Sequence, residues 1–99
     1  MAVIYPKKAT ATAVAGTFSV TIPATAGICK QIFVKATTSS TTFDVKLVDI
    51  FSLTVLEDTD STGLYNQFME LPCYGSWTLT ISNASVNEAF DYLIVVQEF

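Results

Sequence analysis

Hydrophobic and polar side chains alternate with a period of two along most of the chain, as in strands that bury one face. The alternation is clearest over residues 18–22, 28–37, 43–47 and 77–81. No stretch keeps the i, i+3, i+4, i+7 spacing of an amphipathic helix. Turn-forming residues separate the runs at intervals of roughly 8 to 12 residues. The pattern predicts an all-β fold: a single antiparallel β-sandwich of about seven or eight strands, with jelly-roll or immunoglobulin-like topology.

Three features mark expected strand boundaries. The alternation of residues 43–47 loses its phase near Asp49, which predicts a bend there and a new strand over residues 51–55. Residues 57–63 combine acidic and hydroxyl side chains with a final glycine, and so predict a turn. Pro72 is expected to end the edge strand that follows, because proline has no N–H to donate to a ladder.

The two ends of the chain differ from the rest. Residues 90–99 are apolar on both faces, which predicts a strand that is central in its sheet or contacts another subunit. Residues 1–8 predict an extended N-terminal arm that frays or pairs with a neighbour's sheet edge, because Pro6 isolates them. Residues 9–99 then form the one β-sandwich domain. The candidate partner-binding residues at the two ends are Val3, Ile4, Tyr5, Leu93, Val95 and Phe99.

The composition indicates a surface that another molecule covers. Of the 99 residues, 51% are hydrophobic and 14% are charged, whereas roughly a quarter are charged in ordinary soluble domains. The chain has 14 Thr and 8 Ser, so hydroxyl groups must take much of the exposed surface. The mean hydropathy is +0.46. Because large uncovered apolar patches are rare on soluble monomers, we expect the protein to be a subunit of an assembly.

The charge argues against several classes of partner. The net charge is -4, with five lysines and no arginine, which disfavours nucleic-acid binding, since that depends on cationic contacts to phosphates and guanine edges. No apolar run approaches the length of a membrane span, so no membrane partner is expected. The start of the chain lacks the hydrophobic segment of a signal peptide, which predicts cytoplasmic synthesis.

The sequence offers no catalytic constellation. The run Cys73-Tyr74-Gly75-Ser76-Trp77 is similar to the surroundings of a papain-type nucleophile, but a thiolate needs a base and the chain has no histidine. We therefore expect no enzymatic activity and no cofactor. Two cysteines, Cys29 and Cys73, cannot close a tetrahedral zinc site. Without an oxidising compartment we expect them to be buried thiols that do not pair with each other.

One acidic segment partly matches a calcium loop. Asp58, Asp60, Thr62 and Gly63 reproduce the first half of an EF-hand loop, but the twelfth position is Met69 in place of a bidentate glutamate. A full EF-hand is excluded, and we expect no bound metal. A looser calcium site and a polar turn with aspartate caps both remain open readings.

The aromatic residues allow an alternative function. Trp77, Tyr74, Tyr65 and Tyr92 could form a flat platform for a sugar ring, which would make the protein a carbohydrate-binding β-sandwich module. However, Trp77 lies on the same face of its strand as Leu79 and Ile81, as a core residue does. The pattern favours a buried Trp77 over a sugar platform.

The closing run GSWTLTISNASVNEAFDYLIVVQEF has a Gly-aromatic-Thr-Leu strand, an Asn/Ser loop and an aromatic-rich terminal strand. In this pattern it resembles the last hairpin of small β-sandwich accessory proteins on tailed-phage particles. The resemblance implies a head decoration or cement protein that binds the major capsid lattice, or a fibre or tail subunit. Its implied partners are the major capsid protein or another virion protein, together with further copies in a homo-oligomer. The implied location is the virion, after synthesis in the host cytoplasm.

Overall fold

The computed structural model describes residues 2–4, 9–22, 27–73 and 75–98, with side chains over 10–22, 27–72 and 75–97. These residues form strands and no helix, and therefore contain no helix long and apolar enough to cross a membrane. The strands are β1 (Ala2–Ile4), β2 (Ala9–Ala13), β3 (Phe18–Ile22), β4 (Gly27–Ala36), β5 (Thr42–Val48), β6 (Thr54–Thr62), β7 (Leu64–Cys73), β8 (Trp77–Ser82) and β9 (Glu88–Glu98).

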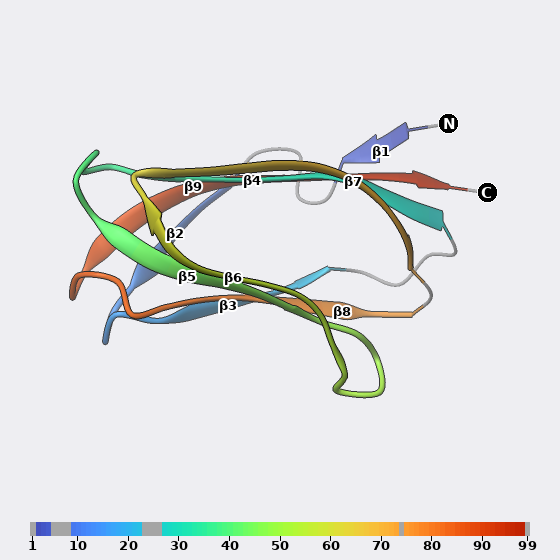
Figure 1. Cartoon of the computed structure of the whole chain (residues 1–99), viewed down its shortest axis with the longest axis horizontal. Helices are drawn as coiled ribbons and strands as arrows, with labels where there is room; N and C mark the ends of the chain where they lie inside the picture. The colour runs from blue at the N-terminus through green and yellow to red at the C-terminus, as the bar shows by residue number, and fades with distance from the viewer. Residues whose placement is uncertain (1, 5–8, 23–26, 74, 99) are drawn as a thin grey trace.

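The strands make two facing antiparallel sheets (Figure 1). The five-stranded sheet has the order β1-β9-β4-β7, with β2 also paired to β9, and the four-stranded sheet has the order β3-β8-β5-β6. The pairs β2–β9, β3–β8, β4–β7 and β5–β6 are nested within one another along the chain. This is one long hairpin rolled into two layers, the arrangement of a jelly roll. The predicted β-sandwich is confirmed, and the strand order selects the jelly-roll alternative.

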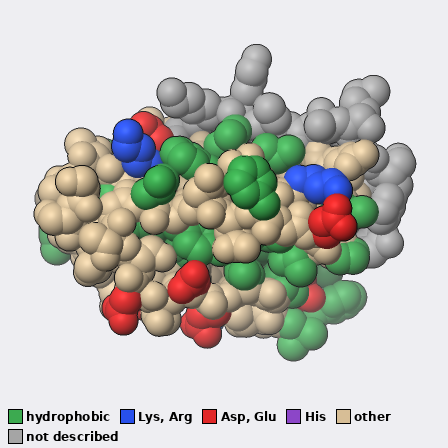
Figure 2. Space-filling model, turned by 45° about the horizontal axis from the view of Figure 1, so that its top comes forward, with side chains coloured by type: hydrophobic (Ala, Val, Ile, Leu, Met, Phe, Trp, Pro, Cys, Tyr) green, Lys and Arg blue, Asp and Glu red, His purple; other side chains and the backbone are tan. Residues whose placement is uncertain are grey.

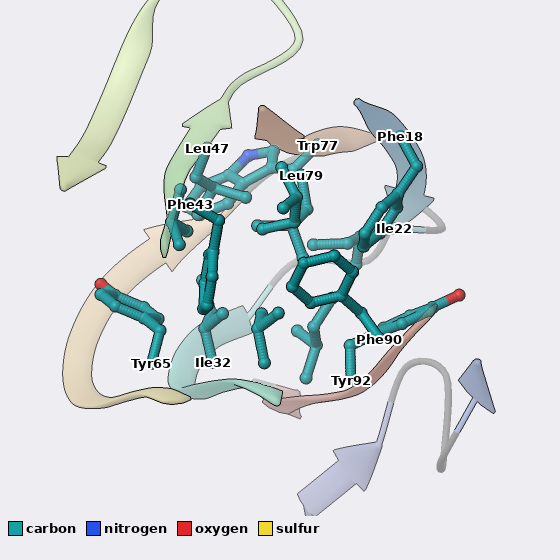
Figure 3. Close-up of a cluster of buried hydrophobic side chains, with 14 of the residues drawn as sticks. Phe18, Ile22, Ile32, Phe43, Leu47, Tyr65, Trp77, Leu79, Phe90 and Tyr92 are labelled. Carbon is teal, nitrogen blue, oxygen red and sulfur yellow. The ribbon is translucent and has the colours of Figure 1, made fainter. Parts of the chain in front are cut away.

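The core lies between the two sheets and is filled by the inward rows that period-two alternation predicts. Trp77, Leu79 and Ile81 are all buried on β8, and Trp77 is only 4% exposed. Figure 3 shows Trp77 within the cluster, which confirms the prediction that it is a core residue. The sheets also meet through aromatic rings: the centroid of Phe90 lies 5.4 Å from that of Phe18 and 5.1 Å from that of Phe43.

Two tyrosines close the rim of this core. Tyr65 and Tyr92 are 5% and 8% exposed, and in Figure 3 their hydroxyl groups point away from the cluster. The rings therefore contribute apolar area while the oxygens stay near solvent. Burial raises the pKa of both phenols, and for Tyr65 the charge of Asp58 adds to the rise in pKa.

The bend expected near Asp49 is a hairpin turn between β5 and β6. A carboxylate oxygen of Asp49 accepts hydrogen bonds from the backbone N–H groups of Phe51 (2.9 Å) and Leu53 (3.0 Å). Ser52 adopts a positive φ of 64° at the turn. The predicted new strand over 51–55 is therefore wrong at its start, and β6 begins only at Thr54. The reason is that the aspartate side chain takes backbone donors that a ladder would otherwise use.

The turn predicted over residues 57–63 is wrong. Strand β6 runs through Asp58, which pairs with Val45, and continues to Thr62. Its acidic and hydroxyl side chains indicated a loop, but β6 is the edge of its sheet, where charged side chains face solvent and discourage pairing with other chains. The predicted end at Pro72 is also wrong, because Pro72 pairs with Ile28 within β7. An edge strand tolerates proline, since only one side of it joins a ladder.

Strand β9 is central, as predicted from its two apolar faces. It pairs with β4 on one side and with β1 and β2 on the other. The short β1 pairs with β9 of the same chain, with Val3 opposite Val96 and Ile4 opposite Val95. Residues 5–8 lie outside the described residues, so the arm as a unit remains a prediction.

Gly63 alone makes the corner at which the chain passes from one sheet to the other. Its φ is +72°, its N–H donates to the carbonyl of Thr41 (2.7 Å), and its carbonyl accepts from the N–H of Ala36 (2.8 Å). A Cβ here would lie 2.4 Å from the carbonyl oxygen of Ser39, a backbone atom that cannot easily move. Glycine is therefore required by both conformation and space.

We expect Trp77→Ala to reduce the free energy of unfolding by about 3 to 5 kcal/mol, the usual cost of removing a large buried aromatic side chain. Urea unfolding followed by circular dichroism measures it. Thr78→Ala, its half-buried neighbour on the outward face, is the control and should cost less than about 1 kcal/mol. Red-shifted Trp77 emission that iodide quenches readily in the native protein would contradict the burial.

We expect Gly63→Ala to destabilise the fold by more than about 1 kcal/mol, because the native φ is incompatible with an L side chain and the backbone of Ser39 blocks the Cβ. Gly75→Ala is a matched control with φ +78°, where the Cβ would meet the flexible end of the Ile50 side chain. Thermal unfolding should show the larger loss for Gly63→Ala. Equal losses would mean that the contact with Ser39 contributes nothing beyond the φ strain.

Candidate binding surface

The outward face of the five-stranded sheet holds two of the predicted partner-binding residues. Because Tyr92, Ile94 and Val96 point into the core, the alternation of β9 turns Leu93 and Val95 outward, where both are half-buried. Of the other predicted residues, Val3 and Ile4 are placed by their backbone pairing to β9, and their side chains are not described. Tyr5 and Phe99 lie outside the described residues. Within the described residues, β1 near the N-terminus therefore pairs with β9 near the C-terminus.

Cross-strand pairing surrounds Leu93 and Val95 with further apolar groups. Leu93 lies opposite Phe33 on β4. Val95 lies opposite Gln31, which is in turn opposite Phe68 on β7. We name as the outer-face patch the five apolar residues that these rows and the neighbouring row expose: Phe33, Leu64, Phe68, Leu93 and Val95.

The outer-face patch is open to solvent mainly at its β7 side. Phe68 is 68% exposed and Leu64 is 49% exposed. Figure 2 shows hydrophobic side chains gathered on this face, with basic and acidic side chains on either side of them. Phe33, Leu64 and Phe68 were not among the residues singled out from the sequence. For Phe33 and Leu64 the signal was present in the alternation, since each lies next to a buried residue of the opposite phase, whereas Phe68 lies between the exposed Gln67 and the half-buried Met69. Only the sheet order brings the three beside β9.

Polar pairs lie within the outer-face patch and beside it, because Gln31 separates Val95 from Phe68 and Asn66 lies opposite Phe33. The Nζ of Lys30 lies 2.7 Å from a carboxylate oxygen of Glu70, and this contact lowers the pKa of Glu70 through a hydrogen bond and charge attraction. The amide of Gln31 donates to the side-chain oxygen of Asn66 (2.8 Å), and the Thr10 hydroxyl donates to Asp91 (2.9 Å). The polar groups within and beside the patch are thus already paired with one another.

A second apolar feature lies at the β5–β6 turn. Ile50, Phe51 and Leu53 are 56%, 77% and 63% exposed. The turn is fixed by the Asp49 carboxylate, as described above, and the Ile50 side chain packs against Gly75. In Figure 1 this turn projects below the four-stranded sheet, away from the outer-face patch.

The acidic segment considered for calcium does not form a loop. Asp58, Asp60 and Thr62 lie on β6, and Gly63 is the corner that follows it. The side chain of Asp44 accepts a hydrogen bond from the backbone N–H of Asp60 (3.0 Å) and another from the Asn83 side chain. These bonds lower the pKa of Asp44 and occupy its oxygens. Within the described part of the chain, no group of three or more His, Cys, Asp or Glu side chains is placed to hold a metal ion.

The aromatic residues considered for a sugar platform do not share an exposed surface. Trp77, Tyr65 and Tyr92 are buried in the core, and Tyr74 lies outside the described residues. Cys29 is 1% exposed, whereas the side chain of Cys73 is not described. The expectation that the two cysteines do not pair therefore remains a prediction.

Comparison with known proteins gives fold likeness only. No protein-family model matches the sequence, and no curated protein matches it. Dimeric latent PorU from Porphyromonas gingivalis is similar in structure, with a TM-score of 0.54, 12% identity, and coverage of 98% of this chain but 12% of that one. This likeness shows the shared fold and nothing of function.

Weaker likenesses include PliG from Aeromonas hydrophila, a periplasmic inhibitor of g-type lysozyme, with a TM-score of 0.49, 17% identity, and coverage of 97% of this chain and 86% of that one. They also include a chain from the structure of infectious bursal disease virus Gt strain, with a TM-score of 0.37 and 10% identity. The match covers 97% of this chain and 31% of that one. The resemblance to this viral chain is weak.

We expect saturating calcium to leave the melting temperature essentially unchanged, because a ligand stabilises a fold only in proportion to its binding to the folded state. Differential scanning fluorimetry with calcium and with EDTA measures the effect. Asp58→Asn should respond as the unmodified chain does. A rise of many degrees that EDTA abolishes and Asp58→Asn removes would contradict the expectation and identify β6 as a calcium site.

Proposed function

We propose that the protein is a non-enzymatic structural subunit of a virus-like particle, a decoration or cement protein that binds the major capsid lattice through the outer-face patch. The observation that carries the proposal is the patch itself, an apolar surface on the face of a well-packed sheet. Its most open member, Phe68, is 68% exposed. Solvent-facing apolar clusters of this kind mark interaction surfaces on soluble proteins.

The architecture of the surface suits attachment to another protein. Aromatic and aliphatic side chains form most of it, the hydrogen-bonded Gln31 and Asn66 lie among them, and the Lys30–Glu70 ion pair lies beside them. The inner rows of β4 and β9 are buried, so the patch residues on these two strands are presented by a rigid scaffold and little order has to be gained on binding. With 14% charged residues, the chain has few groups that would resist being covered.

The virion context comes from analogy. Jelly rolls are the fold of many viral capsid and lectin domains, and a fold by itself does not assign a function. Of these two uses, the lectin use receives no support from the aromatic side chains, because Trp77, Tyr65 and Tyr92 are buried. The resemblance of residues 75–99 to phage accessory proteins supports the capsid use.

An antibody against the purified chain, applied to density-gradient fractions of particles from the source of the gene, tests the location. We expect the protein to co-sediment with intact particles. We also expect purified chain to rebind to particles from which it has been removed. If the protein stays at the top of the gradient in every preparation, the proposal fails.

We expect Leu93→Glu to weaken rebinding to particles by roughly 30-fold, the equivalent of about 2 kcal/mol, because it would bury a charge among the apolar residues of the interface. Thr80→Glu is the matched control, a half-buried outward position on the central strand of the other sheet, opposite Lys46. Circular dichroism should show both variants folded. Equal rebinding by both variants would contradict attachment through the outer-face patch.

A further inference from the structure

We infer that two copies of the chain join edge to edge through β7, antiparallel across a two-fold axis, so that the five-stranded sheet continues through the dimer. The inference rests on the proposed function, because it assigns part of the outer-face patch to a second copy of this chain. It concerns the β7 side of the patch, whereas the particle-binding test concerns Leu93 at its β9 side.

Strand β7 has one unpaired edge. It pairs with β4 on one side, and no other strand in the described ranges pairs with its other side. It is 10 residues long, and before Pro72, which has no N–H, it presents a row of backbone donors and acceptors over residues 64–71. Such an edge is a template for another extended strand, which adds main-chain hydrogen bonds as the source of affinity.

The other edges of the sandwich are poorly suited to this pairing. Strand β6 exposes Glu57, Asp58 and Asp60, and its ladder with β5 shifts register twice. Strands β1, β2 and β3 have only three, five and five residues. By contrast, the one charged residue of β7 is Glu70, whose carboxylate is already paired with Lys30. Length and charge therefore select β7 among the strands that border the two sheets.

A second copy fits this edge because the pairing is self-complementary. A two-fold axis beside the free edge of β7, perpendicular to the sheet, sets each β7 antiparallel to its partner and keeps both outer faces on the same side. Phe68 is directed outward and lies near the middle of the 10-residue β7, so in a pairing centred on the strand the Phe68 side chains of the two copies lie near the axis. The two outer-face patches would merge into one continuous apolar surface, which covers the most exposed part of each and leaves Leu93 available to the particle.

The two-fold contact also closes on itself. An isologous edge pairing uses up the β7 edge of both copies and leaves none for a third, so it gives a dimer and not a fibre. The net charge of -4 on each copy makes the copies repel one another at a distance. Added salt screens that repulsion and should strengthen the dimer.

Sedimentation velocity on the full chain, from low micromolar to near-millimolar concentration, tests the inference. We expect a concentration-dependent species of twice the 10.7 kDa chain mass, with more dimer at higher salt. Hydrogen exchange at both ends of this range should show additional protection in the dimer over residues 64–71. That protection separates backbone pairing at the edge from stacking of the outer faces.

We expect Phe68→Lys to reduce the dimer association constant by at least tenfold, because it sets two like charges beside the axis. Phe51→Lys is the matched control, an exposed phenylalanine on the β5–β6 turn, and should leave the constant unchanged. Both side chains are largely exposed, at 68% and 77%, so neither change should prevent folding.

Three other outcomes would overturn the edge pairing, and a fourth would overturn the proposed function instead. A dimer that survives Phe68→Lys but not Phe51→Lys would form through the turn. A dimer without added protection over 64–71 would form by stacking of the outer faces. A chain that is monomeric at all concentrations yet rebinds particles would remove the dimer and keep the proposed function. A β7 dimer that never associates with particles would keep the edge pairing and remove the proposed function.

Discussion

The contact between the two sheets at Phe90 is the interaction on which the rest of the structure depends. Phe90 is fully buried on β9 of the five-stranded sheet, and its ring meets Phe18 and Phe43, which belong to β3 and β5 of the other sheet. The Phe43 ring meets it edge-on at 78°, a favoured aromatic geometry. Because the side chains of a close-packed interior leave few voids, the inward row of each strand has to match this cluster.

The inner packing sets the outer face. Once Tyr92, Ile94 and Val96 are committed to the core, the period of two leaves no choice for Leu93 and Val95, which must point outward. A strand with apolar residues in both phases therefore fills the core and also supplies an apolar outer surface. The candidate binding surface is in this sense a consequence of the core, and no loop or mobile element is needed to present it.

Edges and corners follow a different logic from the core. Strand β6 is polar and acidic, and it is still a strand because β5 supplies its partner groups and its outer side faces solvent. Gly63 then carries the chain from the acidic edge of one sheet to the apolar edge of the other within a single residue. The sandwich thus has an edge strand with several acidic side chains, β6, connected directly to an edge strand with a single charged residue, β7.

The amino-acid sequence by itself determined the fold class, the buried row Trp77, Leu79 and Ile81, and the central position of β9, because these depend on local alternation. It also indicated Leu93 and Val95 as outward residues. A strand that is apolar on both faces can turn only one face to the core, so the residues of the other face point outward. The tertiary structure alone decided the jelly-roll order, the strand character of residues 57–62 and the association of Phe33, Leu64 and Phe68 with β9. The physical reason is that a strand's neighbours are chosen by hydrogen bonds between segments far apart in the chain, so residues that share a surface carry no common local pattern.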